Sequence, residues 1–280
     1  MKNKLCCLVA AFVAICLAAA GHAEATCYGN LDAQWNGVNP GQDVTVHAYP
    51  GTEVSPGLLT GLATTGGMYN FIYKDDLIGP PDPKETLTGL SDGDDFHTHC
   101  IDVQNYVGGR ERWKVCDVID APDPNTLLGN VNISDAKETL LRKLYFLYPD
   151  STITTLTDPD AKDKKASARQ IAVWEIVFEH WKGLNATDTT SSFWVTDDGG
   201  AGGDANTMLS AVASYEWQYG DMMPVLYAFV DRVEGDSGDQ DQLWLLEGGG
   251  EEYIPEPLTV LGMFLGLGSV GAYIRRRRMM

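Results

Sequence analysis

The chain has 280 residues, of which 44% are hydrophobic, so it can bury a sizeable core in one large domain or two small ones. Twenty Lys and Arg against 39 Asp and Glu give a net charge of −19. Loss of the first 23 residues would remove Lys2 and Lys4 (−19 − 2 = −21), and loss of the tail would remove four Arg (−21 − 4 = −25). A surface this acidic repels phosphate backbones, which excludes nucleic acid as a partner.

The amino-terminal segment is typical of an export signal. Lys2 and Lys4 precede an apolar run at 5–20, and small residues allow cleavage after Ala23 or Ala25. The alternative is a membrane anchor, but the run is short for a bilayer core of about 30 Å. We therefore predict a signal peptide over residues 1–23 and an extracellular domain over residues 24–247.

Strand patterns dominate the first part of that domain. Apolar and polar residues alternate at 44–48 and 96–103, and residues 69–73 are aromatic and β-branched. A further strand is predicted at 112–118, and Gly and Pro residues fall in the gaps between these segments.

Helical spacing follows. Ser134 is placed to cap a helix that runs to about Tyr148 and stops at Pro149. The remaining pattern predicts helices at about 163–181 and 206–217 and strands at 193–196, 225–233 and 243–246. We therefore expect an α+β fold, a β-rich, sandwich-like domain with about three helices inserted between strand regions.

Gln170 is the most informative residue of the second helix. It shares one helical face with a set of large apolar residues, Val173, Trp174, Val177, Phe178 and Trp181. An unpaired buried amide costs roughly 1–3 kcal/mol, so the fold should give Gln170 a partner. A backbone group, exposure at the first turns of the helix, or a chemical role would each satisfy this requirement.

The sequence around Gln170 resembles a known family. Gln170-Ile-Ala-Val-Trp174 is similar to the Gln-x-Ala-Ile-Trp stretch of Cys–Gln thioester domains in surface adhesins, and Phe96-His-Thr-His-Cys100-Ile-Asp102 is similar to their cysteine segment. The resemblance covers about residues 95–105 and 166–182. It departs from the family motif at Arg169, where Thr is common.

The resemblance implies a thioester between the Cys100 thiolate and the Gln170 side-chain carbonyl. His97 or His99 would take the thiol proton, Asp102 follows the cysteine, and Trp174 would shield the bond from water. By strand alternation, His97 and His99 lie on one face and Cys100 on the other. An amine on a surface protein or polysaccharide would be captured once as an amide, so the resemblance implies neither enzymatic turnover nor a cofactor.

The cysteines leave the pairing open. A chain without its signal holds Cys27, Cys100 and Cys116, and an oxidising exterior favours one disulfide with one cysteine left over. Pairing of Cys27 with Cys116 would leave Cys100 for the thioester. Pairing of Cys100 with Cys116 would close a hairpin and remove that possibility.

We predict no metal site. The acidic Gly-rich loops at 92–95, 197–204 and 236–241 lack the spacing of an EF-hand loop, and His97 and His99 have no further ligand pair at zinc-site spacing.

The carboxyl-terminal tail carries a second candidate targeting segment. An acidic linker at 248–254 leads to Pro255-Glu256-Pro257, an apolar run at 258–274 and the cluster Arg275, Arg276, Arg277 and Arg278. At 1.5 Å per residue the run spans about 25 Å, which predicts a transmembrane helix with the arginines on the cytoplasmic side. A simple tail anchor is the alternative to a sorting signal.

Residues 255–278 together resemble the PEP-CTERM sorting signal, which the membrane enzyme exosortase processes in bacteria. The resemblance implies a precursor held in the inner membrane of a Gram-negative bacterium and then moved to the cell surface or extracellular matrix. The function expected from the whole sequence is covalent surface attachment. The alternative is a non-covalent structural or glycan-associated biofilm matrix protein.

Overall fold

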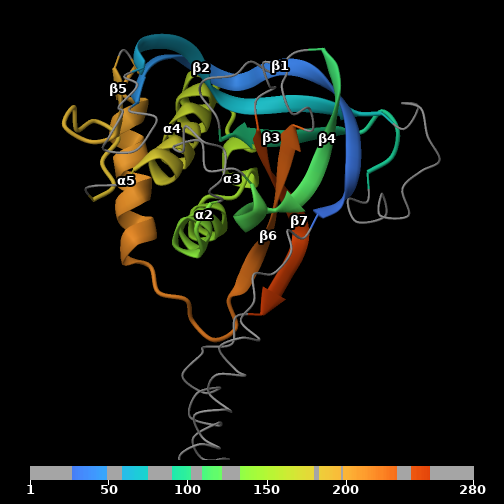
Figure 1. Cartoon of the computed structure of the whole chain (residues 1–280). Helices are drawn as coiled ribbons and strands as arrows, with labels where there is room; N and C mark the ends of the chain where they lie inside the picture. The colour runs from blue at the N-terminus through green and yellow to red at the C-terminus, as the bar shows by residue number, and fades with distance from the viewer. Residues whose placement is uncertain are drawn as a thin grey trace, which may run out of the picture.

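The computed structural model contains one antiparallel sheet with helices packed against it (Figure 1). It describes residues 27–48, 59–74, 90–101, 109–121, 133–179, 183–196, 198–231 and 241–252. The strands are β1 (Cys27–Ala48), β2 (Leu59–Tyr73), β3 (Asp95–Cys100), β4 (Arg110–Asp117), β5 (Phe193–Thr196), β6 (Met222–Asp231) and β7 (Gln242–Glu252). They lie in the order β2-β3-β7-β6-β4-β1-β5.

An additional pairing between β1 and β2 closes six of these strands into a ring. β1 makes this possible because its first part pairs with β4, from Cys27↔Cys116 to Gln34↔Arg110, and the rest pairs with β2. Its last residues also pair with β5. Register shifts around Val38 bend β1 between these partners. At the bend, a Cβ on Gly67 would lie 2.6 Å from the Cα of Gly41, so only glycine fits this crossing.

Aromatic side chains gather on one face of the ring strands. The alternation of β2, β3, β4, β6 and β7 points these residues to the same side, where they form a buried cluster. Its members include Tyr69, Phe71, Phe96, Trp113, Tyr227, Phe229 and Trp244. Cys100 belongs to this cluster and is fully buried.

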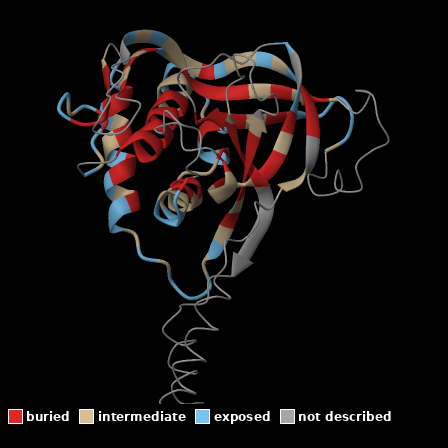
Figure 2. Cartoon of the chain, in the orientation of Figure 1, coloured by how far each residue is buried: buried red, intermediate tan, exposed pale blue. Residues whose placement is uncertain are grey.

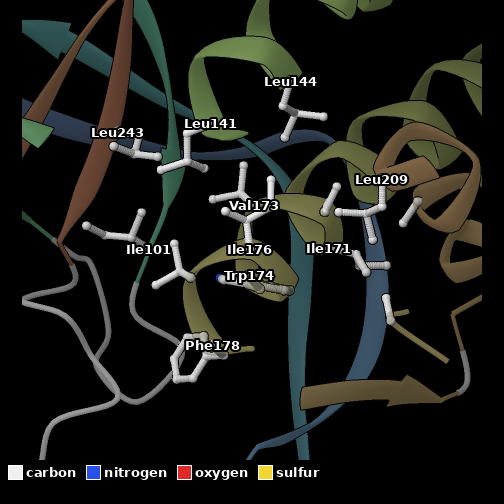
Figure 3. Close-up of a cluster of buried hydrophobic side chains, with 14 of the residues drawn as sticks. Ile101, Leu141, Leu144, Ile171, Val173, Trp174, Ile176, Phe178, Leu209 and Leu243 are labelled. Atoms are coloured by element: carbon white, nitrogen blue, oxygen red, sulfur yellow. The ribbon is translucent and has the colours of Figure 1, made fainter. Parts of the chain in front are cut away.

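The helices cover the opposite face of the strands. They are the short 3₁₀ helix η2 (Val118–Asp120), α2 (Asp135–Leu147), α3 (Ser151–Thr154), α4 (Pro159–Phe178) and α5 (Ala201–Ser214). α4 packs against α5, β1 and β2, and Figure 2 shows its carboxyl-terminal half buried on all sides. Trp174 of α4 belongs to a buried apolar cluster that also includes Leu141 of α2, Leu209 of α5 and Leu243 of β7 (Figure 3).

Local signals explain where the helices begin and end. The Ser134 hydroxyl accepts a hydrogen bond from Lys137 N at 3.4 Å, as expected for a cap of α2. Asp158 caps α4 in the same way through Asp160 N, and Pro159 occupies the first turn. α4 therefore runs over 159–178 and α5 over 201–214, each starting several residues before its predicted position.

The predicted fold class is wrong. The strands form one antiparallel sheet that closes on itself, not a sandwich-like arrangement. Alternation shows which residues face a core, but it does not show that one long bent strand joins both ends of the sheet. The predicted transmembrane helix also finds no support: no helix in the described part of the chain is both long and apolar enough to span a bilayer, and residues 258–274 lie outside that part.

Candidate functional site

Gln170 and Cys100 are in direct contact although 70 residues separate them in sequence. The backbone N–H of Cys100 donates to Gln170 Oε1 at 3.0 Å, and Gln170 Nε2 donates to the carbonyl oxygen of Cys100 at 2.6 Å. Both residues are fully buried. The partner required for a buried glutamine is therefore the backbone of the cysteine with which the family resemblance pairs it.

The carboxamide occupies a vacant edge of β3. Pairing between β2 and β3 runs only as far as Tyr69↔Thr98, and the earlier part of β2, back to Leu59, pairs with β1 and leaves β3. Ile101 N points the other way and donates to Asp241 O, beside β7. Alternation therefore turns the polar backbone groups of Cys100 toward the side that β2 has left, where the Gln170 amide replaces the missing strand.

Polar residues along one face of α4 set its position against the sheet. Asp163 accepts from Gly41 N at 3.1 Å. One turn later, the Ser167 hydroxyl accepts from Gln42 N at 2.8 Å and donates to Gly66 O at 2.6 Å. Gln170 continues this face at helical spacing. Three successive contacts therefore hold the helix across β1, β2 and β3 and bring Gln170 to Cys100.

Arg169 is buried beside this contact. Its guanidinium donates to Tyr148 O at 2.8 Å, approaches His99 Nε2 through two nitrogens at 3.1 and 2.9 Å, and forms an ion pair with the carboxylate of Asp150. It also lies over the ring of Tyr145, 5.4 Å from the centroid. A buried charge is tolerated when it is paired and hydrogen-bonded, and Arg169 has an ion pair and a polar contact through each of its three nitrogens.

His99 serves as an acceptor in this network. Burial and, next, the Arg169 guanidinium hold the pKa of His99 well below its ordinary value, so the ring is neutral. Its Nε2 faces Arg169, and the ring packs edge-on against Tyr145. His99 thus faces α2 and α4, whereas the Cys100 side chain lies in the aromatic cluster on the other face of β3.

The other residues singled out from the sequence have different positions. His97 lies on the same face of β3 as His99, with its Nδ1 buried and without a hydrogen-bond partner in the described structure. Trp174 is fully buried one turn after Gln170. Asp102 lies outside the described residues, as do Pro255, Glu256, Pro257 and the four arginines at 275–278.

The disulfide joins Cys27 to Cys116, which is one of the two pairings that the sequence left open. It lies where β1 and β4 begin their pairing, at the register pair Cys27↔Cys116. Cys100 forms no disulfide and keeps its thiol.

Sequence reasoning missed the role of Arg169. It shares helical spacing with Ala166, Val173 and Ile176, all of which are buried, so a second apolar stripe on α4 was the available signal.

Among the described residues, no group of three or more His, Cys, Asp or Glu side chains is arranged to hold a metal ion. No protein-family model, curated protein or solved structure matches this chain.

Proposed function

We propose that this chain is an exported surface protein that attaches covalently to amine-bearing partners through a thioester between Cys100 and Gln170. The observation that carries the proposal is the pair of hydrogen bonds between the Gln170 carboxamide and the backbone of Cys100. They hold the carbonyl carbon next to the one described cysteine that is outside the disulfide.

The same contact supplies electrostatic assistance. The N–H of Cys100 donates to Oε1, the oxygen that would become negative when sulfur adds to the carbonyl. Strand side chains project out of the hydrogen-bonding plane, whereas the carboxamide is held against the strand edge. This arrangement favours approach of the thiol to the open face of the carbonyl.

The proposed reaction has two steps. In the first, Sγ of Cys100 adds to Cδ of Gln170, the Cδ–Nε2 bond breaks, and the thiol proton leaves with the nitrogen as ammonia. In the second, a primary amine adds to Cδ, the Cδ–Sγ bond breaks, and one amine proton returns to sulfur. The product is a substituted amide at Gln170 and a regenerated Cys100 thiol.

The buried surroundings suit a bond that must survive until a partner arrives. Cys100, Gln170 and Trp174 have no solvent exposure, so bulk water is kept from the thioester carbon. His99 is engaged with Arg169 on the other face of the strand, so the proposal gives the thiol proton to the departing nitrogen and not to His99. Export, exosortase sorting at residues 255–278 and surface display complete the proposal.

Intact-mass spectrometry of the mature protein tests this function. We expect a mass one ammonia below that of the disulfide-bonded sequence, with methylamine adding at Gln170 to give an N-methyl amide one CH2 above the unmodified mass. Cys100→Ala should show the full mass and take up no methylamine. A wild-type protein of full mass, without methylamine at Gln170, would mean that the amide only packs and would favour the non-covalent matrix protein.

A further inference from the structure

A second site lies on the same strand, outside the Cys100–Gln170 contact. A cavity of about 380 Å³ opens between β3, β7 and the segment 150–154, and Asp95, His97, Asp150 and Thr154 line it together with leucines such as Leu90. This volume is within the range of small-molecule sites, which combine apolar walls with a few convergent polar groups.

Three of the polar groups have unused hydrogen-bonding capacity. His97 Nδ1 is buried without a partner. Within the described residues, neither the Asp95 carboxylate nor the Thr154 hydroxyl forms a hydrogen bond or an ion pair. Asp150 differs because its carboxylate pairs with Arg169 behind the cavity wall.

The chemistry of the lining selects the ligand. No Lys, Arg, Asn or Gln is among the described residues that line the cavity, so this lining offers an anion no charged or amide donor. The unpaired carboxylate of Asp95 favours a cation. A primary ammonium has three N–H donors, and Asp95, His97 and Thr154 offer three acceptors, the histidine in the tautomer with its proton on Nε2.

We infer that this cavity binds a primary ammonium group, as carried by a lysine side chain or a small polyamine. The inference goes beyond the thioester and does not require it. His97 precedes Cys100 by three residues, about 10 Å along the strand, and lies on the face opposite the Cys100 side chain. The cavity is therefore a binding site separate from the proposed capture site.

Amide chemical shifts measured by NMR in the Cys100→Ala variant test this binding without interference from covalent capture. We expect n-butylammonium to cause saturable shifts around residues 95–98 and 151–154. Tetramethylammonium carries the same charge but no N–H donor, and it should bind at least about fivefold more weakly. Nα-acetyl-lysine methylamide, which keeps its side-chain ammonium, and putrescine are tested separately. They distinguish a protein side chain from a free polyamine as the source of the amine.

Variants locate the site. Asp95→Asn should weaken n-butylammonium binding by about tenfold, because it removes the one unpaired charge among the described lining residues. Asp43→Asn removes an exposed carboxylate from β1 and should leave the affinity unchanged. Shifts that do not saturate, that persist in Asp95→Asn, or that appear equally with the neutral sugar cellobiose would overturn the inference.

Discussion

The side chain of Gln170 completes the hydrogen-bonding edge of a strand at Cys100, a residue 70 positions earlier in the chain. This contact is useful to the protein whether or not a covalent bond follows. It satisfies a buried amide and two buried backbone groups at once. It also holds the carboxamide against the backbone of the cysteine, on which the proposed chemistry depends.

The contribution of this contact to the free energy of unfolding can be measured in a variant that lacks the Cys100 thiol. In the Cys100→Ala background, Gln170→Ala should lower the free energy of unfolding by about 2–4 kcal/mol, because it leaves a buried N–H and a buried C=O without partners. Urea denaturation provides the measurement, and Gln34→Ala, at an exposed position of β1, provides the control. Equal effects of the two substitutions would contradict the contact.

The buried arginine should be far more important to stability than a surface charge on the same helix. Arg169→Met should cost about 3–5 kcal/mol, because it leaves the carboxylate of Asp150 buried and unpaired. Adding Asp150→Asn should restore part of that loss. Lys164→Met, which breaks the exposed pair with Asp204, should cost less than about 1 kcal/mol in the same denaturation assay.

Removal of the disulfide should destabilise the fold strongly. The bond between Cys27 and Cys116 spans a sequence separation of 89, so its loss frees a long loop in the unfolded chain. The double variant Cys27→Ala/Cys116→Ala should lose about 2–5 kcal/mol, seen as a lower thermal midpoint. The wild type under reducing conditions should match the double variant. A midpoint unaffected by reduction would refute this expectation.

Glu175 should make stability depend on pH. Burial, opposed by the N–H of Asn185 and reinforced by Glu179 and Asp188, raises the pKa of Glu175 to about 8. Its Oε1 accepts from Asn185 N at 2.6 Å, whereas Oε2 is buried without a hydrogen-bond partner in the described structure. Between its ordinary pKa and 8, the folded protein holds a proton that the unfolded chain releases, so stability falls as pH rises.

Glu175→Gln tests this dependence. The variant lacks the titrating group but keeps an oxygen that can accept from Asn185, so it should gain on the wild type by at most ~1.4 kcal/mol per pH unit over that window. Urea unfolding of both proteins at pH 5 and pH 8 checks the result. An advantage of the same size at both pH values would show that the carboxyl does not titrate in this range.

The sequence predicted the parts of this fold that depend on local patterns. Alternation located β3 and β5, and the cap at Ser134 located the start of α2. It did not locate the first part of β1, because Gly37, Pro40 and Gly41 interrupt the alternation there while the strand continues through a bend. Ring closure depends on which strands meet across the sheet, and no local pattern records that.

The candidate site was likewise predictable only where a local sequence pattern records it. A glutamine on an apolar helix face required a partner, and the resemblance to thioester domains pointed to Cys100. The network around Arg169 was not predicted, because a charged residue on a helix is normally assigned to solvent. Only the positions of Asp150, His99 and Tyr148 in the folded chain provide the partners that make its burial possible.

The arrangement of the ring also constrains how the protein can be made. β7, the last described strand, lies between β3 and β6, so each of those strands has an open edge until residues 242–252 arrive. Assembly must therefore wait for almost the whole domain, as expected for a chain dominated by distant pairings. A fragment ending before β7 would expose two aromatic-rich edges and should self-associate. We propose that this protein is exported. Late closure of the ring would keep the chain unfolded enough to pass through the membrane until its last strand has been translocated.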